Sequence, residues 1–237
     1  SLPALALALP TLPFYILLPV YYAEVTPLTL VQVGGWLMLA RLFDVFSDGL
    51  AARWCDRPLG RLGRKGWILL GALLAAPGLW GLSAPGEGAG GLWLLGCSIL
   101  LYSGWTLIQI PYTAWLVSLT QTPPERLRLS SSREALGMVG LVLSALWPAL
   151  GGWLGWSTEQ IFQYLALTAL LWGGLSLLWM LRLLPQPAAQ ETNLNWRALF
   201  SLAPQRRLLL VWWLNGLANA IAAVLFPLII SAWLLLP

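Results

Sequence analysis

The sequence contains no histidine and only two cysteines among its 237 residues. The absence of histidine removes the commonest metal ligand and the side chain best suited to proton transfer near neutral pH. The two cysteines, Cys55 and Cys97, fit neither a metal-binding pattern nor a disulfide pattern. An enzyme would need a nucleophile or a clustered set of metal ligands, so the composition argues against a membrane enzyme.

Charged residues are also scarce, because they make up 9% of the chain while 59% of it is hydrophobic. A soluble domain carries about 25% charged residues, which it needs to cover its surface. We therefore expect an all-α, polytopic membrane protein. The net charge of +4 is not a signal for nucleic acid, since in such a protein the distribution of the charges matters more than their sum.

A membrane-spanning helix needs about 20 mostly apolar residues, and the sequence offers seven candidates. They are residues 2–22, 28–52, 67–82, 91–119, 135–155, 161–183 and 208–236. Pro10, Pro13 and Pro19 predict kinks in the first of them. The chain starts and stops within apolar runs, so we expect it to be a piece of a longer protein.

The basic residues predict the orientation of these spans. Twelve of the thirteen fall in the links between spans two and three, four and five, and six and seven. The opposite links hold only acidic charges: Glu24, Glu87 and Glu159. By the positive-inside rule, the N-terminus and the basic links are cytoplasmic, and the protein belongs in the inner or plasma membrane.

This arrangement predicts three parts. Residues 1–183 form a six-helix bundle, residues 184–207 a polar cytoplasmic linker, and residues 208–237 the first helix of a second bundle. Two bundles joined by such a linker are typical of transporters built from repeats.

One face of the second span carries charge. Arg41, Asp44 and Asp48 lie three and four residues apart and share that face, with Ser47 beside them. Each charge costs at least about 2.5–3.5 kcal/mol on insertion scales, so the face must contact protein or a water-filled cavity. Two carboxylates a turn apart repel each other, which favours binding of a proton, and their oxygens also suit a hard cation such as Na⁺. Arg41 can compensate one of the carboxylates, so we expect a structural or gating role for it. The alternative is an Arg–Asp pair that only stabilises helix packing.

The fourth span supplies a partner. Thr106 and Gln109 share a face of that span, and at about 1.5 Å rise per residue Gln109 lies at nearly the depth of Asp44. This predicts a proton or cation site between the two spans. Equally, Thr106 and Gln109 are polar residues that can hold two helices together by hydrogen bonds.

A short basic turn links spans two and three. It contains Asp56, Arg57, Gly63, Arg64 and Lys65, for which we expect a structural or gating role at the cytoplasmic surface. The alternative is anchoring by positive charge alone, which any membrane protein needs.

Several stretches together resemble the major facilitator superfamily. More narrowly, they resemble its glycoside–pentoside–hexuronide:cation symporters, the melibiose-permease-like branch. The stretches that carry the resemblance are residues 21–24, 40–48, 56–65, 108–112, 125–133 and 215–219. The resemblance implies a twelve-helix fold of two six-helix bundles around a central cavity, of which this chain holds the first bundle and helix seven. It also implies cation-coupled sugar uptake by alternating access.

The resemblance assigns roles residue by residue. Asp44, Ser47 and Asp48 match the cation-site positions of helix two, and Thr106 and Gln109 match those of helix four. Sugar-transporting members with a sodium site typically have aspartate where this chain has Gln109. The substitution therefore favours H⁺ over Na⁺ as the coupling ion.

The resemblance also suggests residues that bind the substrate. Arg133 matches an arginine near the sugar site, and Tyr112 follows the proline of helix four. Asn215 and Asn219 share a face of helix seven and can donate hydrogen bonds to a polar solute or bridge the two halves. Ala8 stands where galactoside carriers have a sugar-binding carboxylate, so galactoside specificity is not implied.

We therefore predict a secondary active transporter that moves a small polar solute, such as a sugar or glycoside, together with a cation. It needs no cofactor and no metal, and its partners are the solute, the coupling cation and the lipid bilayer rather than nucleic acid. Two alternatives remain: a carrier of an amphipathic or lipid-like solute, and a non-transporting sensor or scaffold on the same fold.

Overall fold

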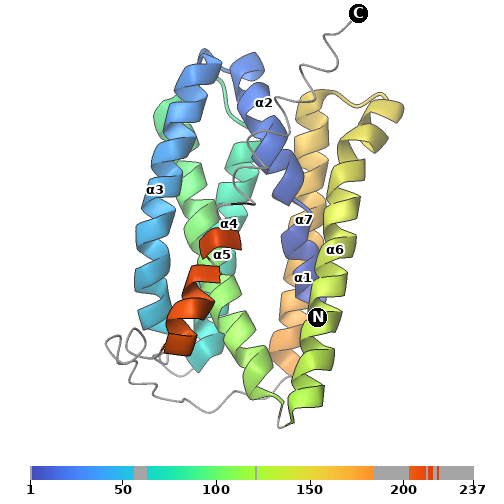
Figure 1. Ribbon diagram of the computed structural model, residues 1–237. Coiled ribbons are helices and arrows are strands. Elements are labelled where there is room, and N and C mark those ends of the chain that lie inside the picture. The colour runs from blue at the N-terminus through green and yellow to red at the C-terminus, as the bar shows by residue number, and fades with distance from the viewer. Residues whose placement is uncertain are drawn as a thin grey trace, which may run out of the picture. The chain divides into compact units, whose positions relative to one another are not determined.

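The computed structural model describes residues 2–55, 63–120, 122–183, 203–211, 213–215 and 218. These residues are helical wherever they are regular, without a strand among them, as the composition predicts. The elements are α1 (Leu2–Ala8), the π-helical turn η1 (Pro13–Leu17), α2 (Leu18–Val25), α3 (Leu30–Cys55), α4 (Gly63–Ser83), α5 (Gly91–Ser118), α6 (Pro123–Trp153) and α7 (Thr158–Leu183) (Figure 1).

Six segments of the described chain are long and apolar enough to cross a membrane. They agree with the first six predicted spans, because α1, η1 and α2 together form the first of them. The chain divides into two compact units, residues 1–191 and 192–237. In the second unit, residues 203–211 are helical, so this helix includes residues upstream of position 208, where the sequence predicts the seventh span to begin.

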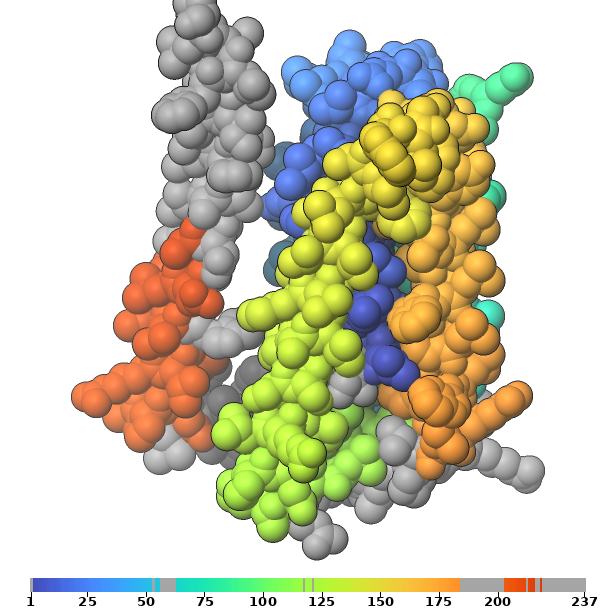
Figure 2. Space-filling model, turned by 90° about the vertical axis from the view of Figure 1, so that its right-hand side faces the viewer, coloured from blue at the N-terminus to red at the C-terminus, as the bar shows by residue number. Residues whose placement is uncertain are grey.

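Helix α5 is the central packing element of the first unit, since both α3 and α4 pack along it (Figure 1). Helix α4 also contacts α7, and the first span packs against α6 and α7. Figure 2 shows this second contact from the side, with the blue first span visible between α6 and α7. Large apolar side chains remain exposed along α3, as expected for a helix whose outer face meets an apolar phase.

Small residues let α4 and α5 approach closely. A Cβ atom on Gly104 would lie 2.6 Å from the carbonyl oxygen of Gly71 and closer still to the backbone nitrogen of Ala75. Glycine is therefore required at this crossing for steric reasons, as is common where membrane helices touch.

The first span is interrupted in the middle. Pro10 and Pro13 lack the backbone N–H that would continue the helix, and the chain passes through the π turn η1 before α2 begins. The N–H of Leu12 donates a hydrogen bond at 3.2 Å to Oγ of Ser144, a fully buried residue of α6. The break confirms the kink predicted at Pro10 and Pro13, whereas Pro19 lies in the first turn of α2. A side chain from another helix satisfies one backbone group at the break.

The start of α6 corrects one prediction. The fifth span was expected at residues 135–155, but α6 begins at Pro123. Thr122 and Glu125 form a capping box, with the N–H of Thr122 donating to Oε2 of Glu125 at 3.3 Å, and two prolines occupy the first helical positions. Arg126, Arg128 and Arg133 therefore lie on a helix and not in a loop, because the capping signals outweigh the drop in hydropathy.

We expect Gly104→Ala to destabilise the protein by about 1–3 kcal/mol, because the new methyl group overlaps backbone atoms of α4. The measurement is the thermal unfolding midpoint in detergent. Gly96→Ala is the matched control on the same helix, since a Cβ atom there meets nothing within 4 Å. A Gly104→Ala variant as stable as Gly96→Ala would contradict the close approach.

Candidate cation and substrate site

A cavity of about 230 Å³ lies between the interrupted first span, α3 and α5. Its lining residues are Pro10, Thr11, Phe14, Tyr15, Leu18, Arg41, Asp44, Leu82, Leu101, Tyr102, Trp105 and Thr106. Two of these are charged, Arg41 and Asp44, and both belong to the face of α3 that the sequence predicts to be polar. That face therefore meets a cavity, as the cost of charge in a membrane requires.

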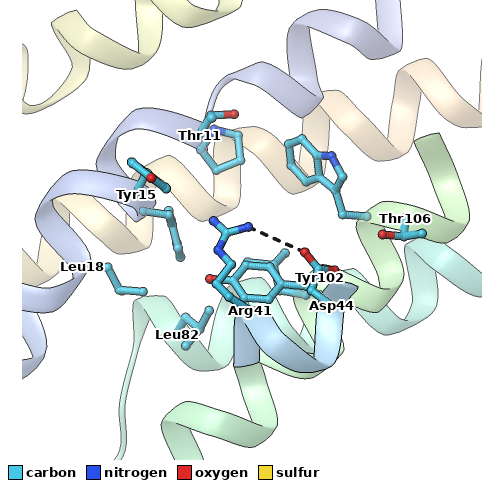
Figure 3. Close-up of a pocket in the computed structure, with 12 residues that line it drawn as sticks. Thr11, Tyr15, Leu18, Arg41, Asp44, Leu82, Tyr102 and Thr106 are labelled. Carbon is cyan, nitrogen blue, oxygen red and sulfur yellow. Dashed lines mark ion pairs between the residues drawn. The ribbon is translucent and has the colours of Figure 1, made fainter. Parts of the chain in front are cut away.

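Arg41 extends into this cavity and is held mainly by aromatic rings (Figure 3). Its Cζ atom lies 4.3 Å from the ring centroid of Tyr102 and 5.6 Å from that of Tyr15, both within cation–π range. One guanidinium nitrogen lies 3.7 Å from Oδ2 of Asp44, which is an ion pair but too long for a hydrogen bond. The side chain of Arg41 is 50% exposed and that of Asp44 19%.

Asp44 has one oxygen that the ion pair does not reach. Its Oδ1 is buried and has no hydrogen-bond partner in the part of the chain that the structure describes. A buried carboxylate oxygen without a donor is costly if the group is ionised, so it is a favourable position for a proton or a cation.

Asp48 differs from Asp44 in its surroundings. Its Oδ1 accepts a hydrogen bond of 2.6 Å from the Thr106 hydroxyl, which joins α3 to α5. Thr106 is nearly buried and also lines the cavity. The predicted partnership between the second and fourth spans is therefore formed, through Asp48 and Thr106.

The prediction that Gln109 lies at nearly the depth of Asp44 is wrong. Pairing of Asp48 with Thr106 puts Asp44 level with Tyr102, and Gln109 lies seven residues, roughly 10 Å, further along α5. The backbone carbonyl oxygen of Gln109 accepts a hydrogen bond of 2.8 Å from the Thr113 hydroxyl. Among the described residues, the side chain of Gln109 makes no hydrogen bond. The prediction counted both residues from the start of their spans, whereas the contact between Asp48 and Thr106 shows a different register between α3 and α5.

Ser47 is engaged within its own helix. Its hydroxyl donates a hydrogen bond of 3.0 Å to the carbonyl oxygen of Asp44. Ser47 is not among the residues that line the cavity, so in this conformation it stabilises α3 rather than offering an oxygen to a ligand.

The predicted substrate residues of α5 and α6 lie elsewhere in the bundle. Arg133 donates a hydrogen bond of 3.0 Å to the hydroxyl of Thr113 and forms an ion pair with Glu134. Tyr112 is buried in an apolar cluster with residues of α4 and α7. Neither Arg133 nor Tyr112 lines the cavity that holds Arg41 and Asp44.

The basic turn is described only from Gly63 onward. Gly63 adopts a φ of 55° at the start of α4, and Arg64 lies in the first turn of that helix. The ammonium of Lys65 donates a hydrogen bond of 2.6 Å to the carbonyl oxygen of Leu181, near the end of α7. A cation at a helix C-terminus is favourable, so Lys65 stabilises the contact between α4 and α7.

Four of the predicted site residues do not belong to the described part of the first unit. Three of them lie outside the described residues: Asp56, Arg57 and Asn219. Asn215 is helical and belongs to the second compact unit.

Sequence reasoning missed the aromatic part of the cavity. Tyr102 lies one turn before Thr106, so the spacing that selected Thr106 also indicates Tyr102. Tyr15 and Phe14 could not be found in this way, because their position depends on the π turn and on how the first span packs against α3 and α5.

An ion pair in a cavity between membrane-spanning helices is typical of transporters. The sequence model of the MFS/sugar transport protein family matches residues 1–230. The chain belongs to this family, which confirms the resemblance drawn from the motifs and places the chain with transporters rather than enzymes.

Three relatives agree with this assignment. The uncharacterized symporter sll1374 of Synechocystis is 28% identical over 190 residues, which cover 69% of this chain and 33% of the relative. The glucuronide carrier protein homolog of Escherichia coli is 29% identical over 122 residues, or 48% of this chain and 26% of the relative. The inner membrane symporter YicJ of Escherichia coli is 28% identical over 130 residues, or 53% and 28%. The chain thus spans about a third or less of the length of these relatives.

We expect Thr106→Val to lower stability by about 1–3 kcal/mol, because it keeps the shape of the side chain but removes the donor to Asp48. Thr106→Ser retains the hydroxyl and is the matched control. The measurement is the thermal unfolding midpoint of both variants in detergent. Equal midpoints would show that the Asp48 carboxylate does not depend on Thr106.

Proposed function

We propose that the complete protein is a secondary active transporter that couples the movement of a small polar, sugar-like solute to that of a proton, by alternating access. The observation that carries the proposal is the buried Oδ1 of Asp44, which lies beside Arg41 in the cavity and has no hydrogen-bond partner among the described residues. Family membership and the two relatives named as symporters support coupled transport.

A proton fits Asp44 better than a sodium ion does. A hard cation needs several oxygen ligands, whereas a proton needs one. The nearest carboxylate, Asp48, already accepts the Thr106 hydrogen bond, and the lining of the cavity offers no carboxylate besides Asp44 among the described residues. The coupling ion is therefore H⁺.

The other lining residues favour a sugar. Tyr15, Tyr102 and Trp105 contribute aromatic surface to the lining, and Thr11 contributes a hydroxyl. Sites for small molecules combine such apolar surfaces with a few polar groups that fix orientation. The relative named as a glucuronide carrier homolog points to the same class of solute. A lipid-like solute is less suited to a cavity with an ion pair in its wall.

The transporter lies in the cell membrane with its N-terminus in the cytoplasm. This orientation follows from the basic residues, which cluster at one end of the spans, as with Arg126 and Arg128 at the start of α6. A non-transporting sensor on the same fold would share this topology but would show no solute counterflow.

We expect Asp44→Asn to abolish uptake driven by a pH gradient while solute exchange across the membrane continues, because the amide cannot take up the coupled proton. Loss of a coupling free energy of 1–3 kcal/mol lowers accumulation by about 5- to 150-fold. The measurement is uptake of a labelled sugar by proteoliposomes that contain the complete protein, with and without a pH gradient.

Glu24→Gln is the matched control, because Glu24 is an exposed acid on α2 that does not line the cavity. It should retain proton-driven uptake. Replacement of Na⁺ by choline should leave the wild-type rate unchanged. Proton-driven accumulation by Asp44→Asn at the wild-type level would refute the assignment.

A further inference from the structure

We propose that the adjoining ends of α4 and α7 bind an anionic phospholipid, with Arg64 and Arg182 near the charge of its headgroup and the outer face of α7 against its acyl chains. This inference goes beyond the proposed function and does not depend on it. It rests on how the fold combines positive charge with exposed apolar surface at one end of two membrane-spanning helices.

The start of α4 and the end of α7 are in contact. Lys65, in the first turn of α4, donates a hydrogen bond of 2.6 Å to the carbonyl oxygen of Leu181 on α7. Arg64 and Arg182 are the chain neighbours of these two residues, so cationic side chains from two helices extend from one place. Arg182 is exposed and Arg64 is partly exposed, so both are accessible to a ligand outside the bundle.

The positive charge of these two arginines is not compensated within the part of the chain that the structure describes. Neither Arg64 nor Arg182 forms an ion pair with a described carboxylate. The acids in the first half of α6 are used within that helix, since Glu125 caps its start and Glu134 pairs with Arg133. Each basic residue at a membrane surface raises the affinity for anionic lipid by about fivefold.

The face of α7 that leads to Arg182 is apolar and exposed. Leu175, Leu178 and Trp179 are 67%, 49% and 57% exposed, and they lie seven, four and three residues before Arg182. These spacings place the four side chains on one face of the helix. Figure 2 shows α7, in orange, along the outside of the bundle. Along this face aliphatic residues are followed by an indole and then by a cation, which is the order of acyl chains, interface and headgroups in a bilayer.

The combination favours an anionic phospholipid over two other ligands. A soluble phosphate would use the arginines but not the apolar face of α7. A zwitterionic lipid would use the apolar face, but it brings no net charge to the arginines. An anionic phospholipid uses both, because burial of its chains and attraction of its headgroup add to each other.

The experiment compares two lipids that share their acyl chains and differ in headgroup charge: dioleoylphosphatidylglycerol, which is anionic, and dioleoylphosphatidylcholine, which is zwitterionic. The complete protein in detergent is titrated with each, and bound lipid is counted by native mass spectrometry. We expect the anionic lipid to bind at least about fivefold more tightly. High salt should weaken this preference, because it screens exposed charges. The anionic lipid should also raise the thermal unfolding midpoint, since it binds the folded state.

Variants test whether the two arginines carry the preference. Arg64→Gln combined with Arg182→Gln should lose most of it, whereas Arg64→Lys combined with Arg182→Lys should keep it, because lysine retains the charge. Arg126→Gln combined with Arg128→Gln is the matched control, since it removes the same charge from the start of α6 and should leave the preference unchanged. The unfolding midpoint of each variant without added lipid tests its fold, and the wild-type comparison of the two lipids needs no variant.

Equal binding of the two lipids by the wild type, a preference that survives the loss of both arginines, or an equal loss in the α6 control would overturn the inference. Displacement of the anionic lipid by inorganic phosphate alone would overturn it too, because the site would then be one for a soluble anion. None of these outcomes bears on proton-coupled uptake, so the proposed function is tested separately.

Discussion

The ion pair between Arg41 and Asp44 is the interaction on which the arrangement around it depends, because two charges inside a membrane-spanning helix must be compensated. At 3.7 Å the pair is too long to satisfy either group by hydrogen bonding. The aromatic rings of Tyr15 and Tyr102 supply the remaining stabilisation of the cation. Among the described residues, Oδ1 of the carboxylate has no hydrogen-bond partner, so the ion pair compensates charge but does not complete the hydrogen bonds of Asp44.

Packing at some distance from the pair keeps the rings in position. Helix α5 carries Tyr102, and α4 approaches it so closely at Gly104 that a single methyl group would not fit. Tyr15 belongs to the π turn of the first span, where prolines interrupt the helix and Ser144 of α6 accepts the N–H of Leu12. The contacts of α4 with α5 and of α6 with the first span therefore position the two rings that surround the guanidinium group of Arg41.

Sequence reasoning found the parts of this site that depend on one helix. The spacing of Arg41, Asp44 and Asp48 identifies a common face, and the same argument on the fourth span selects Thr106. It failed where the position of one helix relative to another matters. The distance of Gln109 from Asp44 depends on the register between α3 and α5, which the sequence of a single span does not determine. It also missed Tyr15, whose position follows from an interrupted helix, and the start of α6, where a capping box acts against the hydropathy.

The two aspartates of α3 are equivalent in sequence but not in the folded protein. They lie one turn apart on the same face, and the difference between them comes from α5: Asp48 meets a hydroxyl donor, whereas Asp44 meets a ring and a cation. The hydrogen bond from Thr106 ties Asp48 to α5. Among the described residues, Oδ1 of Asp44 has no hydrogen-bond partner. An offset of one turn along α5 thus gives Asp48 a hydroxyl donor and leaves Oδ1 of Asp44 without one in the part of the chain that the structure describes.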